Sequence, residues 1–209
     1  MTPVARPRSR RGEGERLRDE ILTAADELLV ETASEDAVSI RAVADAVGVT
    51  PPSIYRHFPD KTSLLVAVCL RSFDSFAEVM RDARDPDDPL ESLRALALAY
   101  VRYGLEHPEH YRIMFLDRLD LSAEQYAEEL MSESSSFGVL IETVRSLKAS
   151  GILRPELVAM DDFHLSVLLW SSVHGLTSLF VAKPNLPWAD QEALVDGACD
   201  LILNGVLKR

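Results

Sequence analysis

Apolar residues recur every three or four positions along most of the chain, which is the period of an α-helix. The first apolar stripe runs from Leu17 to Leu29 and gives way to a polar stretch from Thr32 to Ala37. The same pattern predicts further helices at about 39–47, 51–58, 60–82, 90–106, 109–117, 122–150, 160–182 and 188–207. No stretch alternates apolar and polar residues between turns, so we expect an all-α protein of about nine helices.

The two short helices at 39–47 and 51–58 carry distinct end signals. Ser39 and Thr50 are placed as N-caps, and Gly48 can adopt the left-handed conformation that ends a helix. Pro51 occupies a first helical position, where its missing N–H costs nothing. The short turn around Gly48 makes the pair a candidate helix-turn-helix. Its second helix is short enough to enter a DNA major groove about 12 Å wide.

A motif at the end of this pair resembles a known family. The run Tyr55-Arg56-His57-Phe58, followed by Lys61 and the pair Leu64-Leu65, resembles the N-terminal domain of tetracycline-repressor-type (TetR) regulators over about residues 16–66. Farther along, two segments resemble the C-terminal domain type of that family named for a Trp-His-Gly signature: His107 to Phe115, and Trp170 to Leu176.

The resemblance implies a domain organisation and a function. A basic arm (1–15) would precede a three-helix helix-turn-helix DNA-binding domain (16–66), followed by a helical effector-binding and dimerisation domain (67–209). The protein would be a ligand-responsive transcriptional repressor. It would bind double-stranded DNA at a palindromic operator as a homodimer, and an unknown small-molecule effector would release it. A helical enzyme and an interaction module that does not bind DNA are the two alternatives.

The resemblance also assigns DNA contacts. The positions that would face the bases are Arg41, Thr50, Pro52, Ser53 and Arg56, and those that would bind phosphates are Tyr55, His57 and Lys61. The chemistry agrees, because arginine offers a bidentate fork to guanine and a proline ring can pack on a thymine methyl. Tyrosine and lysine donate to phosphate oxygens. The N-terminus of the helix near Lys61 is expected to add a partial positive charge for a phosphate. Structural alternatives are a packing role for Tyr55 and a solvated His57.

In the C-terminal part, the resemblance implies an effector pocket and a dimer interface. The candidate pocket residues are Tyr100, Tyr103, Met114, Phe115, Phe137, Trp170 and His174. The candidate interface residues, on the last two helices, are Leu169, Val173, Leu194, Val195, Ala198, Leu201 and Ile202. Plain core packing is the alternative for both sets, and a histidine satisfied by the protein itself is the alternative for His174.

Charge and composition narrow the picture further. The 209 residues carry a net charge of −12, so a uniformly basic nucleic-acid-binding surface is excluded. Residues 1–61 contribute −2, whereas residues 62–209 contribute −10. Residues 1–18 hold six arginines and two glutamates, which fits either an arm that reaches a minor groove or a solvated tail.

No catalytic, metal or cofactor signature is evident. We find no Gly-x-Ser-x-Gly motif and no glycine-rich phosphate loop after a strand, and His107 and His110 lack a third ligand nearby. We also expect no membrane span and no secretory signal. With only two cysteines, Cys69 and Cys199, a reducing cytoplasm is the expected location.

Overall fold

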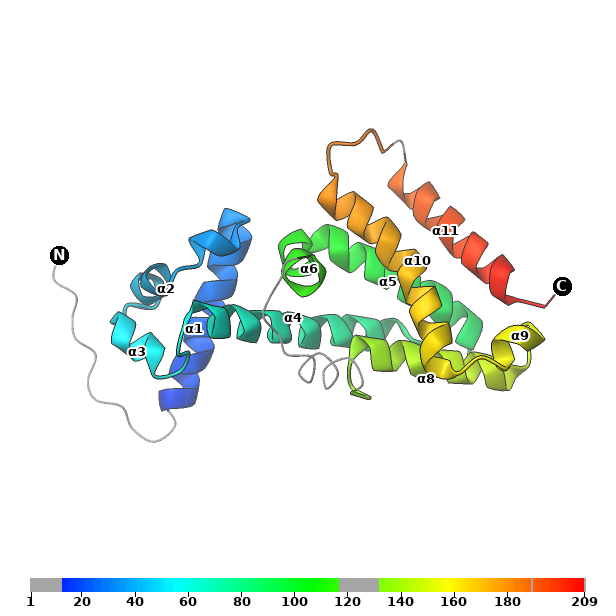
Figure 1. Ribbon diagram of the computed structural model, residues 1–209, viewed down its shortest axis with the longest axis horizontal. Helices are drawn as coiled ribbons and strands as arrows, with labels where there is room; N and C mark the ends of the chain where they lie inside the picture. The colour runs from blue at the N-terminus through cyan, green and yellow to red at the C-terminus, as the bar shows by residue number, and fades with distance from the viewer. Residues whose placement is uncertain (1–12, 117–131, 189, 209) are drawn as a thin grey trace. The chain divides into compact units, whose positions relative to one another are not determined.

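The computed structural model describes residues 13–116, 132–188 and 190–208. Within these ranges the chain forms α-helices and one short 3-10 helix, and none of them contains a β-strand (Figure 1). The predicted all-α class is therefore confirmed. The helices fall into two units: the first holds residues 13–72 and 112–116, and the second holds the remaining described residues.

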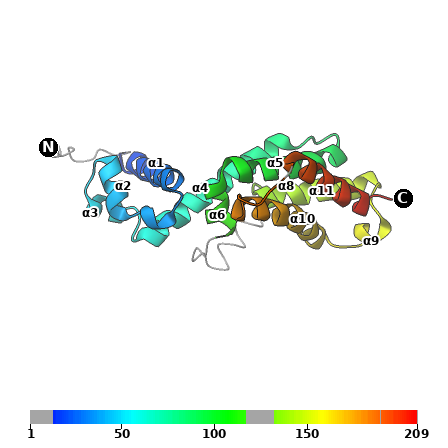
Figure 2. The same ribbon diagram turned by 90° about the horizontal axis from the view of Figure 1, so that it is seen from above.

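The first unit contains the predicted helix-turn-helix. Its elements are α1 (Glu13–Thr32), the 3-10 helix η1 (Glu35–Ala37), α2 (Ile40–Val47), α3 (Pro51–Tyr55) and the start of α4 (Lys61–Ala83). Both views show α2 and α3 beside α1 (Figures 1 and 2). The side chains that fill the centre of this unit are fully buried, and they include Ile21, Ala25, Val43, Ile54 and Leu64.

The second unit is a helical bundle. It contains the rest of α4, together with α5 (Pro89–Glu106), α8 (Ser136–Ser150), α9 (Pro155–Val158), α10 (Asp162–Ala182) and α11 (Gln191–Val206), whereas α6 (Pro108–Phe115) has residues in both units. α10 packs against α5, α8 and α11. α5 and α10 approach closely at Gly104, where an added Cβ would lie 2.4 Å from the Thr177 Cγ2 atom. Only glycine fits there without displacing Thr177.

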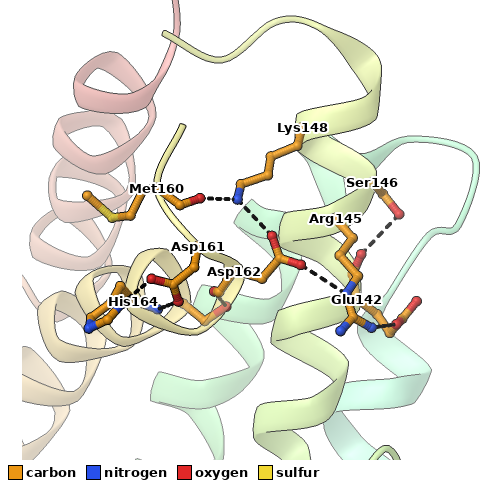
Figure 3. A network of polar contacts seen from close by, with 9 residues as sticks. Glu142, Arg145, Ser146, Lys148, Met160, Asp161, Asp162 and His164 are labelled. Atoms are coloured by element: carbon orange, nitrogen blue, oxygen red, sulfur yellow. Dashed lines mark hydrogen bonds and ion pairs between the residues drawn. The ribbon is translucent and has the colours of Figure 1, made fainter. Parts of the chain in front are cut away.

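Ion pairs fasten the start of α10 to α8 (Figure 3). The Asp162 carboxylate contacts Lys148 Nζ at 2.7 Å and Arg145 Nε at 3.1 Å. The hydrogen bond from Lys148 is the main reason that the pKa of Asp162 lies below its usual value. Asp161 caps the helix by accepting from the His164 backbone N–H and also pairs with the His164 ring. The first turn of α10 is thereby fixed in place.

Most predicted helices are present, but one is wrong in part. The expected helix at 122–150 is not continuous, since residues 132–135 are not helical and α8 begins at Ser136, where the Ser135 side chain accepts from the Gly138 N–H. The four-residue helix α9 was not expected. Residues 117–131, and residues 1–12 of the predicted basic arm, lie outside the described residues.

One described helix has the length and composition of a membrane-spanning segment. Among the described helices, α10 is long and apolar enough to cross a bilayer by length and composition alone, with a mean hydropathy of 1.5 over its most apolar window. Core helices of soluble proteins meet the same criterion, and α10 packs against three other helices here.

Candidate functional site

The turn between α2 and α3 has the predicted capping geometry. The Ser39 side chain accepts from the Ala42 N–H at 3.1 Å at the start of α2. Gly48 ends α2 with a φ of 73°, in the left-handed region, and the Val49 N–H bonds back to the Ala44 carbonyl at 2.9 Å. These local bonds set the direction in which the chain enters α3.

The N-terminus of α3 differs from the expected cap. Thr50 occupies the N-cap position, but its side chain makes no capping bond to the backbone. The reason is local, since Pro52 has no N–H and the Ser53 N–H already bonds to the Thr50 carbonyl at 2.8 Å. The Thr50 and Ser53 hydroxyls instead lie 3.2 Å apart. This pair is exposed at the first turn of α3.

α3 presents one face to solvent and buries the other. Ile54 is fully buried and Phe58, just after the helix, is 3% exposed, as expected for core residues. Tyr55 is 52% exposed, and the exposed face continues through Thr50, Pro52 and Arg56. Arg41 on α2 is also exposed, with Asp45 4.0 Å away. Most residues assigned to base contacts are therefore exposed to solvent, and Ser53 is partly exposed.

Two carboxylates modify the predicted phosphate site at the start of α4. Lys61 Nζ lies 3.8 Å from Asp36 Oδ1 of η1. Asp60 accepts from the Ser63 N–H at 2.7 Å, and this bond lowers the pKa of Asp60. The carboxylate therefore occupies part of the positive helix N-terminus that was expected to face a phosphate. Lys61 itself is half-buried.

In the second unit, a polar cluster surrounds His174 of α10. The Tyr100 hydroxyl lies 2.8 Å from His174 Nδ1, and Trp170 Nε1 donates to that hydroxyl at 3.1 Å. The Tyr111 hydroxyl lies 2.9 Å from the same Nδ1 and 3.0 Å from Ser178 Oγ. Ser178 Oγ is in turn 3.3 Å from His174 Nε2. Both ring nitrogens of His174 therefore have protein partners.

Burial fixes the protonation of this cluster. It lowers the pKa of His174, so the imidazole is neutral at pH 7. It also raises the pKa of Tyr100 and Tyr111, so both phenols keep their protons. A neutral imidazole has one N–H donor and one acceptor nitrogen, so its tautomer decides whether Nδ1 or Nε2 accepts from a neighbouring hydroxyl.

Four of the predicted pocket residues lie in one cluster, Tyr100, Phe137, Trp170 and His174. Phe137 joins the cluster through Trp170, with ring centroids 5.9 Å apart. Tyr103 is buried against Phe76, at 4.7 Å between centroids. Met114 and Phe115 belong to the first unit instead.

Two members of the cluster, Tyr111 and Ser178, were not among the predicted pocket residues. Ser178 lies four residues after His174 and therefore on the same helix face, a spacing that was available as a signal. Tyr111 lies in one of the segments that resemble the family. It is far from His174 in the sequence, so helical spacing could not predict their contact.

The predicted interface residues divide between core and surface. Leu169 and Val195 are buried inside the protomer, and Val173 packs against a core cluster that includes Val195. Leu169 and Val195 are therefore core positions of the protomer, a correction to the predicted interface, whereas Val173 is only partly buried. Ala198 and Ile202 are partly exposed. Leu194 and Leu201 are exposed, Leu201 by 78%.

Two further leucines on α10 extend the exposed surface. We call the four exposed residues Leu168, Leu179, Leu194 and Leu201 the leucine stripe. Gly175 and Gly197 lie between them on their helices, and an added Cβ at either would meet open space. The four leucines and two glycines are themselves uncharged, whereas exposed Asp196 and Asp200 lie between Leu194 and Leu201 in the sequence of α11.

Comparisons with known proteins agree with this architecture. Residues 21–68 match the family described as "Bacterial regulatory proteins, tetR family", and residues 93–202 match "Tetracyclin repressor-like, C-terminal domain". The HTH-type transcriptional activator FasR of Mycolicibacterium smegmatis is 32% identical over 130 residues, which span 55% of this chain and 59% of FasR. The nucleoid occlusion factor SlmA of Cronobacter sakazakii is 28% identical over 194 residues, covering 84% of this chain and 89% of SlmA.

Solved structures share the fold. A TetR-family transcriptional regulator from Pectobacterium atrosepticum superposes with a TM-score of 0.72 at 21% identity, covering 96% of this chain and 99% of that one. The two family matches together extend over both units and include the helix-turn-helix. The chain therefore belongs to the TetR family of DNA-binding transcriptional regulators.

Proposed function

We propose that this regulator is a cytoplasmic repressor that binds a palindromic operator as a homodimer and is released by a small-molecule effector. The observation that carries the DNA-binding part is α3, a short helix anchored by buried Ile54 with an exposed outer face. Members of the family are non-enzymatic DNA-binding proteins, so the helical-enzyme alternative falls away. No cofactor is part of the proposal.

The proposed contacts follow from the exposed face of α3. Arg56 would present its fork to a guanine, and Pro52 would pack against a thymine methyl. Tyr55, His57 and Lys61 would bind phosphates and fix the position of α3 in the groove. Because the Thr50 and Ser53 hydroxyls lie within hydrogen-bonding distance of each other, Arg56, which directly follows α3, is proposed to supply the main base-reading donors.

Replacing Arg56 tests this assignment. Arg56→Ala is expected to lower affinity for the operator about 5- to 150-fold, the range for one lost bidentate base contact. The loss should be confined to one base pair of each half-site, and affinity for unrelated duplex should change little. Fluorescence anisotropy with operators substituted at each position measures this. An equal loss on every duplex would assign Arg56 to a phosphate instead.

The ion pair at Lys61 gives a second expected result. Asp36→Asn is expected to tighten DNA binding about two- to fivefold per subunit, the scale of one exposed charge pair. The substitution frees Lys61 and removes a carboxylate that would lie near the bound phosphate. Glu35→Gln, in the same 3-10 helix, is the matched control. If both substitutions raised DNA affinity equally, the effect would come from the change in net charge and not from the ion pair at Lys61.

The proposed dimer uses the leucine stripe of α10 and α11. Exposed apolar side chains that gather on one surface are typical of a protein interface. A two-fold dimer places the same surface of each copy in contact, and it also presents two α3 helices to the two halves of a palindrome. Leu168 and Leu179 join Leu194 and Leu201 in this proposed interface, with Ala198 and Ile202 at its margin.

Effector release is proposed to act through the second unit. The effector would bind near the predicted residues Tyr100, Phe137, Trp170 and His174, where it would compete with the hydrogen bonds of the cluster. The effector must bind more tightly to a dimer whose two α3 helices do not match the spacing of the two half-sites. The coupling free energy between effector binding and operator binding is then about 1–3 kcal/mol. α4 has residues in both units and is the proposed connection. Release of labelled operator by added small molecules tests this step. If the same small molecule released as much labelled operator from the Trp170→Ala variant as from the wild-type protein, the effector would bind elsewhere.

A further inference from the structure

Arg18 of α1 is held against the turn that follows α3. Its guanidinium Cζ atom lies 5.2 Å from the centroid of the Phe58 ring, within the range of a cation–π contact. Figure 1 shows this turn passing the first half of α1. Phe58 is 3% exposed, so the ring is fixed in the core, while Arg18 itself is exposed.

Arg18 also differs from most cations of the first unit in having no acidic partner. Residues 14–72 of the described chain contain six lysine and arginine side chains. Of these six, only Arg18 and Arg56 have no carboxylate within 4.0 Å. The other four pairs are Arg16 with Glu20, Arg41 with Asp45, Lys61 with Asp36, and Arg71 with Asp26. The second unpaired cation, Arg56, is the proposed base-reading residue.

The geometry of the contact leaves the hydrogen-bonding groups of Arg18 available. A cation–π contact is an electrostatic attraction between the charge and the ring, so it consumes no hydrogen-bond acceptor and leaves the guanidinium N–H groups free to donate elsewhere. These N–H groups form the fork that suits a phosphate. The ring also reduces the side-chain freedom that would be lost on binding.

We propose that Arg18 is a further phosphate-binding residue of the DNA interface, positioned by Phe58. Phe58 directly follows His57, one of the proposed phosphate contacts, so Arg18 would extend that row of contacts from α3 to α1. This inference rests on the DNA binding of the family and adds a contact on a helix outside the helix-turn-helix. A phosphate contact carries no sequence information, so Arg18 is assigned to affinity and salt dependence.

The test compares two arginines of the same helix in the full-length protein. Arg18→Ala should lower affinity about tenfold, the scale of one charge-assisted hydrogen bond. It should also reduce the slope of log affinity against log salt by about 0.9 per subunit. The matched control is Arg16→Ala, which removes the same charge from an arginine already bonded to Glu20 at 3.0 Å. Its affinity should stay within about twofold of wild type.

Two additional measurements separate positioning from charge and from folding. Phe58→Leu keeps the site apolar and removes the ring, so it should reproduce part of the Arg18→Ala loss while the helical circular-dichroism signal is retained. Arg18→Lys should restore the salt slope but not the full affinity, because lysine lacks the planar fork. Both variants are titrated against an operator duplex selected with the wild-type protein and against a scrambled duplex.

The outcomes are distinct. Equal losses for Arg18→Ala on both duplexes, with an intact Arg16→Ala control, support the proposal. Unchanged affinity and salt slope for Arg18→Ala would overturn it, as would equal losses for Arg16→Ala and Arg18→Ala, or a loss seen only on the operator. If the wild-type protein binds no duplex at all, the proposed function fails together with this inference.

Discussion

Leu201→Asp is expected to convert the protein into monomers and to weaken operator binding by at least about 100-fold, because simultaneous binding of two half-sites is lost. Leu201 is 78% exposed in the protomer, so an aspartate there costs the protomer little. At a two-fold interface, however, the same change would bury two unpaired carboxylates among leucines. Light scattering after size-exclusion chromatography measures the mass, and a titration of labelled operator measures the affinity.

The control for this substitution lies in the segment between α10 and α11. Leu186→Asp introduces the same charge at a residue that is 48% exposed and outside the leucine stripe. It should leave mass and affinity unchanged. A dimeric Leu201→Asp protein with full operator affinity would move the interface away from α11.

Ile54→Ala is expected to destabilise the first unit by about 2–5 kcal/mol, the usual range when a buried isoleucine is truncated. Ile54 is fully buried, and it lies in a helix of only five residues. A helix this short does not form by itself, so its packing is what holds it in place. Operator binding should fall with stability, because a loosened α3 no longer presents a fixed surface.

Amide hydrogen exchange is the suitable measurement, since both tryptophans belong to the second unit and do not report on α3. Faster exchange should be concentrated in α2 and α3. Ile54→Val should cost only about 0.5–1.5 kcal/mol and keep most of the DNA affinity. A loss below about 1 kcal/mol for Ile54→Ala would show that the core does not anchor α3.

Local signals predicted the helix-turn-helix well. Ser39 caps α2, Gly48 ends it and Pro51 starts α3, and each of these effects depends only on bonds within a few residues. Thr50 takes the predicted N-cap position, but its side chain makes no capping bond because two local rules compete there. A threonine cap needs backbone N–H groups, and the prolines that favour the start of α3 remove two of them.

Longer-range features were less accessible. α10 is apolar on nearly every side, so periodicity could not show that Leu169 faces the core while Leu168 faces solvent. The partners of His174 come from α5, α6 and α10, and no sequence spacing joins Tyr100 to Tyr111 or to His174. Likewise, the contact between Arg18 and Phe58 joins residues 40 positions apart and depends on how α1 packs against the turn after α3.

Symmetric DNA reading by two α3 helices is the central claim, and repeated selection of binding sites from random duplex DNA tests it most directly. The account predicts an enriched inverted repeat whose half-site centres lie about one helical turn, or a multiple of it, apart. Two protomers should occupy each selected duplex. Enrichment of a single asymmetric site, or no enrichment over the starting pool, would contradict it.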